Sequence, residues 1–136
     1  MSYKPKKRPR DLVLVLGDQL DRDSAAFDTF DPASDAVWMA EVLEESALVW
    51  SHKARITLFL SAMRHFRDLL LRKGITVHYR QLDDPGNRGT LALELKEAVR
   101  RLKPKRLILV TPGEWRVKEN LVKGAKTTHV PLEIRA

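Results

Sequence analysis

The feature that most constrains the fold is a run of five branched apolar residues, residues 12–16, which ends on Gly17, Asp18 and Gln19. A run of this length without a polar interruption is typical of a strand that is covered on both faces, as in a parallel sheet. Because ligands bind beyond the carboxyl ends of parallel strands, a strand that stops on a glycine and an acid also predicts the rim of a binding site.

Strand-like and helical patterns alternate along the rest of the chain. Strands are predicted over residues 36–40, 75–82, 106–111 and 130–134. Apolar residues at three- and four-residue steps predict helices over residues 53–73 and 90–102, and a more polar helix follows the PGEW turn to about residue 123. Residues 21–35 are acidic and contain a proline, which indicates a loop with one short helix at most. The alternation predicts an α/β fold: a three-layer Rossmann-like sandwich with a five-stranded parallel sheet.

Positive charge is concentrated at the N-terminus. The 136 residues carry a net charge of +7, and residues 1–10 hold five basic residues and no acid. Two prolines and little apolar content predict a disordered tail over residues 1–10, followed by one folded domain over residues 11–136. The tail could contact nucleic acid through phosphates, but the nearly neutral remainder is expected to have no appreciable affinity for duplex DNA at physiological salt.

The composition excludes several classes of protein. The chain has no cysteine, which excludes disulfides, zinc ribbons, thiol catalysis and iron–sulfur ligation by this chain. No apolar run approaches the length of a membrane span, and no segment of signal-peptide type follows the basic N-terminus, so we expect a cytoplasmic protein without a membrane partner. The glycine spacing fits neither a dinucleotide-binding fingerprint nor a P-loop.

The acidic residues leave alternatives open. Asp18, with Gln19 beside it, could accept hydrogen bonds from a neutral ligand, or it could cap a short helix over residues 20–26. Glu41, Glu44 and Glu45 precede the long helix either as a solvated turn or as ligand contacts. Asp18 and Glu41 could also supply two carboxylates to a metal, but the four histidines have no metal-ligand spacing, so we predict no metal site and no catalytic residue.

A resemblance to a known family rests on four motifs in order: LVLVLGDQL, AEVLEES, HKARITLFLSAMRHF and TPGEWRV. They resemble the N-terminal antenna domain of the deoxyribodipyrimidine photolyase-related proteins, the iron–sulfur bacterial cryptochromes and six-four photolyases. The resemblance spans about residues 12–134. It implies an α/β domain that binds an antenna chromophore such as 6,7-dimethyl-8-ribityllumazine. It also implies a helical C-terminal domain with FAD and a four-cysteine iron–sulfur cluster, which uses the transferred light energy for DNA photorepair or blue-light signalling.

Several expectations about this chain follow from that resemblance. The sequence stops at Ala136, well before the helical domain of the family, so we expect a truncated or excised domain that is not catalytic as it stands. Its partner would be the missing helical flavin domain, and DNA would be bound only through the full-length parent. The alternatives are a ligand-free structural module that docks the flavin domain, and a standalone metal-dependent α/β enzyme.

The resemblance also implies which residues border the chromophore. They are Gly17, Asp18, Gln19, Ala40, Glu41, Val42, Glu45, Lys53 and Ile56. The first three follow the first strand, the next three end the second strand, and the last two begin the covering helix. One departure is Ala40, where a family member has cysteine; the change affects packing more than hydrogen bonding, because a thiol is a weak donor.

Overall fold

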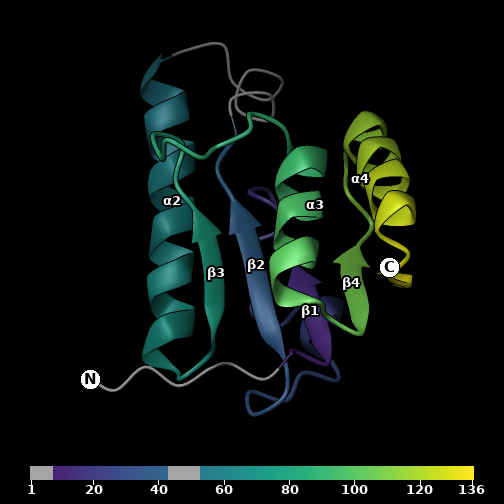
Figure 1. Ribbon diagram of the computed structural model, residues 1–136. Coiled ribbons are helices and arrows are strands. Elements are labelled where there is room, and N and C mark those ends of the chain that lie inside the picture. Colours follow the sequence, from purple (N-terminus) through teal and green to yellow (C-terminus); the bar gives the residue numbers. More distant parts are fainter. Residues whose placement is uncertain (1–7, 43–52) are drawn as a thin grey trace.

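The computed structural model describes residues 8–42 and 53–136, in which one parallel sheet is flanked by helices (Figure 1). The strands are β1 (Asp11–Leu14), β2 (Ala36–Ala40), β3 (Val77–Arg80), β4 (Arg106–Val110) and β5 (Leu132–Arg135). The described helices are α2 (Lys53–Arg72), α3 (Leu91–Leu102) and α4 (Trp115–Thr128), with a 3-10 turn η1 (Ala25–Phe27) after β1. The predicted α/β class with five parallel strands is confirmed.

Strand β1 lies at the centre of the sheet, whose order is β3-β2-β1-β4-β5. Val13 pairs with Val37 of β2 on one side and with Ile108 of β4 on the other. All four residues of β1 are buried, which explains the uninterrupted apolar run, since both faces of a central strand are covered in this architecture.

Alternate residues of β1 enter two separate cores. Leu12 and Leu14 pack with α3 and α4 on one face of the sheet, whereas Val13 packs with α2 on the other (Figure 1). The two core clusters hold most of the large side chains that are fully buried, among them Met63 of α2 and Leu95 of α3. The sheet is therefore the middle layer of the predicted three-layer sandwich.

Helix α4 ends five residues later than predicted, at Thr128 rather than near residue 123. Gly124 lies inside the helix and is buried. A methyl group at Gly124 would lie 3.2 Å from the Cβ of Ala92, so glycine allows α4 to approach α3 closely. Tertiary packing here outweighs the low helix propensity of glycine.

The segment between β1 and β2 decides one of the open alternatives. No helix starts after Asp18; the 3-10 turn begins at Ala25 and is capped by Ser24, whose hydroxyl accepts a hydrogen bond from the Ala26 amide at 3.3 Å. The interpretation of Asp18 as a helix cap is therefore wrong.

Most of the predicted tail lies outside the described residues. Of its described part, residues 8–10, Arg10 is tied to the domain by a bond from its Nη2 to Asp35 Oδ2 at 2.8 Å. No helix in the described part of the chain is long and apolar enough to cross a membrane.

Candidate functional site

The strand order reverses between β1 and β4, because the chain builds β2 and β3 outward from one side of β1 and β4 and β5 from the other. A reversal of this kind leaves a crevice between the two loops that leave the carboxyl ends of the strands. Here those loops are residues 15–19 after β1 and residues 111–114 after β4. The predicted strand-1 loop therefore lies at the place where this fold class binds ligands.

Gly17 is fixed in this loop by an aromatic ring from the covering helix. A Cβ atom at Gly17 would lie 2.2 Å from Cζ of Phe59, a distance that no real contact allows. Phe59 is 7% exposed in the α2-side core, so its ring has little room to move away. The glycine is needed for close packing of the loop under α2, and not for approach to a phosphate.

The two polar residues that follow Gly17 have different roles. Gln19 joins the two loops, because its Nε2 donates to the carbonyl oxygen of Val110 at 2.9 Å. Asp18 is exposed and has no hydrogen-bond or ion-pair partner for its carboxylate among the described residues. A methyl group at Gly113 would lie 3.7 Å from Asp18 Oδ2, so the carboxylate lies close to the β4 loop. The residues on either side of Asp18 are thus fixed by Phe59 and Val110, and its carboxylate is exposed next to the β4 loop.

Glu41, at the carboxyl end of β2, is fully buried and fully paired. Arg64 of α2 binds it in a bidentate manner, with Nε 2.7 Å from Oε2 and Nη2 2.8 Å from Oε1. The Tyr79 hydroxyl also donates to Oε2, and the Leu82 amide donates to Oε1 at 2.9 Å. The interpretation of Glu41 as part of a solvated turn is therefore wrong.

These contacts fix the protonation states of the cluster. Burial raises the pKa of Glu41, but the hydrogen bonds from Arg64, Tyr79 and the Leu82 amide more than offset this, so the pKa of the carboxyl lies below its ordinary value. Burial and the bond to Glu41 raise the pKa of Tyr79, and the same carboxylate raises the pKa of Arg64. Glu41 is therefore ionised, and its two side-chain donors stay protonated, throughout the neutral range.

The remaining predicted site residues fall into three groups. Ala40 and Val42 are buried beside Glu41, and Ile56 is half-buried on α2. Lys53 begins α2, although its side chain is not described, and Glu45 lies outside the described residues. The structure brings the β1 loop and the end of β2 to the same edge of the sheet, because both strands are parallel neighbours.

Sequence reasoning missed the residues that hold Glu41. Arg64 lies within one of the recognised motifs, yet nothing in the pattern assigned it a partner 23 residues away. Asn87 was also missed: its Nδ2 donates to the Glu41 carbonyl oxygen at 2.7 Å and so fastens the β3–α3 loop to the end of β2. Finding either residue requires knowledge of which helix face covers which strand end.

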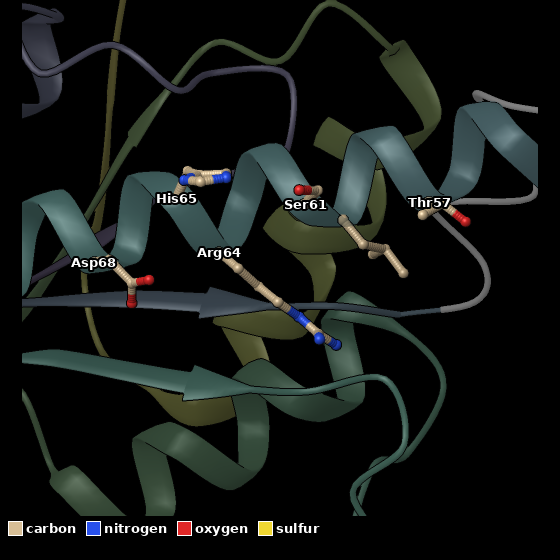
Figure 2. A pocket seen from close by; sticks show the side chains of 6 residues that line it. Thr57, Ser61, Arg64, His65 and Asp68 are labelled. Carbon is tan, nitrogen blue, oxygen red and sulfur yellow. The ribbon is translucent and has the colours of Figure 1, made fainter.

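A groove of about 280 Å³ runs along α2, next to the Glu41 cluster (Figure 2). Its lining includes Ser61, Arg64, His65 and Asp68. Figure 2 shows Arg64 reaching from the helix toward the strands, whereas the His65 side chain points away from Arg64. No hydrogen bond joins Ser61, His65 and Asp68 to one another in the described part of the chain.

Fold and site together define an open parallel α/β domain whose strand order reverses between β1 and β4, with the exposed Asp18 after β1 and, at the end of β2, a buried Glu41 held by the partly exposed Arg64. A family model described as deoxyribodipyrimidine photo-lyase-related protein matches residues 13–136. The chain therefore belongs to the deoxyribodipyrimidine photolyase-related protein family.

A curated relative agrees with this assignment. The chain is 39% identical over 125 residues to a (6-4) photolyase from Agrobacterium fabrum (strain C58 / ATCC 33970), an alignment that covers 92% of this chain and 25% of the relative. The chain thus spans about a quarter of the relative's length. Among solved structures, a universal stress protein family member from Burkholderia pseudomallei is similar with a TM-score of 0.45 and 16% identity over 96% of this chain and 98% of that one. We draw no conclusion from that weaker likeness.

Proposed function

We propose that this chain is the antenna-chromophore domain of a photolyase-related protein, and that it binds 6,7-dimethyl-8-ribityllumazine or a similar chromophore at the carboxyl edge of its sheet. The partner in this proposal is a helical domain with FAD and an iron–sulfur cluster, which receives the light energy. Family membership supports the general assignment, and the observation that carries the choice of site is the exposed, unpartnered carboxylate of Asp18 at the β1–β4 crevice.

The residues present fit such a ligand. A carboxylate in this position can accept hydrogen bonds from the hydroxyl groups of a ribityl chain or from a ring N–H. Gly17 and Gln19 keep the loop in place through Phe59 and Val110, so the acceptor is positioned before the ligand arrives. Such preorganisation suits an antenna, which needs a fixed chromophore orientation and no nucleophile, base or metal.

The role of Glu41 in this proposal is indirect. The carboxylate oxygens of Glu41 accept hydrogen bonds from Arg64, Tyr79 and the Leu82 amide. In this proposal Glu41 therefore positions Arg64 and does not itself contact the chromophore. Arg64 keeps 40% of its side chain exposed. Its guanidinium is the group from this cluster that a ligand at the α2 groove could reach.

Equilibrium binding of 6,7-dimethyl-8-ribityllumazine tests the proposal. We expect the fluorescence anisotropy of the lumazine to rise on titration with the protein, with a dissociation constant in the micromolar range or below. Asp18→Ala should weaken binding at least about tenfold, the effect of losing one or two hydrogen bonds to a charged acceptor. Asp28→Ala, which removes an exposed acid on the η1 side, serves as the matched control and should leave affinity unchanged.

A second ligand separates a specific site from a general affinity for flat rings. 6,7-Dimethyllumazine, which lacks the ribityl chain, should bind the wild type more weakly than the ribityl compound does. The two ligands should bind Asp18→Ala with equal affinity. Absence of any binding by the ribityl compound would favour the alternative of a ligand-free docking module. The observation that favours that alternative is the exposed apolar side chain of Trp115, which is 68% exposed at the start of α4.

A further inference from the structure

Charge is strongly segregated in the fold, although the domain behind the tail is nearly neutral. Residues 11–42 hold eight acidic residues and one basic residue, whereas residues 91–128, which include α3 and α4, hold ten basic residues and four acidic ones. Three of those four acids lie within 4 Å of a cation: Glu94 of Arg80, Glu97 of Arg100 and Glu119 of Lys123. The α3–α4 layer therefore presents a cationic surface that the net charge conceals.

Part of this surface is hollowed into a groove of about 480 Å³ at the amino edge of the sheet. Helices that connect parallel strands run antiparallel to them, so the C-terminal ends of α3 and α4 meet at this edge (Figure 1). The groove has an aliphatic floor formed by Val99, Pro104 and Val130, and two threonines lie on its α4 side. The charged residues that line it are all basic: Arg8, Lys96, Arg100 and Lys103.

These cations come from two segments and form a continuous set. Lys96, Arg100 and Lys103 follow one another at four- and three-residue steps, so they occupy one stripe about 10 Å long that runs along α3 to its C-cap, Lys103. Arg8 joins them, because its Nε donates to the Lys103 carbonyl oxygen at 2.7 Å. In sequence, Arg8 directly follows Lys4, Lys6 and Lys7.

Stabilisation of the α3 C-terminus explains only part of this arrangement. Cations in the last turn interact favourably with the helix dipole, which is sufficient reason for Arg100 and Lys103. The effect fades within a turn, so it gives no reason for Lys96, and Arg8 belongs to another segment. Neither Lys96 nor Lys103 has an ion-pair partner among the described residues, which leaves both charges available to an outside anion.

Contrary to the expectation drawn from net charge alone, we infer that this surface, from Arg8 across Lys96, Arg100 and Lys103, binds the phosphate backbone of duplex nucleic acid without reading its sequence. Two lysines without an ion-pair partner in the described part of the chain, Lys96 and Lys103, beside Arg8 and the Glu97-paired Arg100, give the clustered positive charge on which such binding depends. No aromatic side chain lines the groove among the described residues, so stacking of unpaired bases has no platform there. The surface lies at the opposite edge of the sheet from Asp18, so it is independent of the proposed chromophore site.

Salt-dependent binding to a fluorescein-labelled 20-base-pair duplex tests this inference. For about four phosphate contacts, log K should fall with log salt concentration at a slope of about −3.6 between 50 and 200 mM KCl. The double variant Lys96→Gln/Lys103→Asn should weaken binding at 50 mM at least about tenfold and make the slope shallower by about 2. Asparagine is chosen at position 103 because Lys103 has a positive φ of 50°, which asparagine tolerates.

The matched control is a double variant that also loses two positive charges, but at another place in the fold. Arg72→Gln/Lys73→Gln removes two exposed cations at the end of α2, on the other face of the sheet, and should change affinity and slope much less. Equal losses in both double variants would mean that net charge alone drives binding, and would overturn the inference. It would equally be overturned if deletion of residues 1–7 abolished binding while the α3 double variant had no effect.

Binding to anionic phosphatidylserine vesicles tests a membrane as the alternative partner of this surface. Under the inference, duplex binds at 100 mM KCl and the vesicles compete weakly. Binding to vesicles at a salt concentration at which the duplex does not bind would assign the surface to a membrane instead.

Discussion

Replacement of Glu41 by glutamine should destabilise the domain strongly, although the two side chains have the same shape. Each carboxylate oxygen of Glu41 accepts two hydrogen bonds, one from Arg64 and a second from either Tyr79 or the Leu82 amide. Glutamine replaces one oxygen with an NH₂ group, which faces donors in either orientation. The Tyr79 hydroxyl can rotate and accept instead, but one Arg64 N–H loses its acceptor and the ion pair loses its negative charge.

The expected size of this effect follows from those losses. An unsatisfied buried donor costs about 1–3 kcal/mol, and breaking a buried ion pair costs about 3–5 kcal/mol. Because Arg64 is 40% exposed and regains some hydration, we expect the lower part of this range, about 2–4 kcal/mol. For a chain of this size, that corresponds to a fall in melting temperature of roughly 10 °C.

Urea unfolding followed by circular dichroism measures the change. The control is Glu119→Gln, since Glu119 forms a longer contact, 3.8 Å, with the exposed Lys123. We expect the midpoint of Glu41→Gln to fall clearly and that of Glu119→Gln to stay close to the wild type. Equal midpoints for wild type and Glu41→Gln would refute the claim that the Arg64–Glu41 pair fastens α2 to the sheet.

Two further predictions concern packing and pH. Gly17→Ala should cost about 1–3 kcal/mol, because the new methyl group would overlap the Phe59 ring, whereas Gly113→Ala meets only an ordinary contact and should be nearly neutral in the same urea experiment. Burial raises the pKa values of Glu41 and Asp35, but hydrogen bonds from arginine and backbone amides more than offset this and lower both pKa values in the folded state. Their stabilisation is therefore complete above the unfolded pKa of about 4 and lost as pH falls through the lower folded values. Urea midpoints measured from pH 6 to pH 3 should fall for the wild type and fall less steeply for Glu41→Gln; parallel curves would contradict this assignment.

The fold could be predicted from the sequence because its local and tertiary signals agree. Strand β2 was predicted at the residues it occupies, Ala36–Ala40, because an apolar run of five residues has the length of a strand and is too short for most helices. Helix α3 was located within one residue, and its start is fixed by Thr90, whose hydroxyl accepts a bond from the Leu93 amide at 3.2 Å. The end of α4 was predicted too early because glycine, here Gly124, has a low helix propensity.

The candidate site was less accessible to sequence reasoning. The crevice loop at Asp18 could be located, because the carboxyl end of a central strand has a predictable place in this fold class. The pairing of Glu41 with Arg64 could not, because it depends on the angle at which α2 crosses the sheet. The cationic groove was hidden for a similar reason: Arg8 and Lys103 are far apart in sequence and meet only when β1 and β4 pair.

The most direct test of the central claim is to locate the bound chromophore by nuclear magnetic resonance. Amide shifts of ¹⁵N-labelled protein would be recorded during titration with 6,7-dimethyl-8-ribityllumazine. We predict that the largest saturable changes occur at residues 17–19 and 111–114, on the two sides of the β1–β4 crevice, and disappear in Asp18→Ala. Unchanged spectra, or changes centred on Lys103 and the amino edge of the sheet, would contradict an antenna site at this crevice.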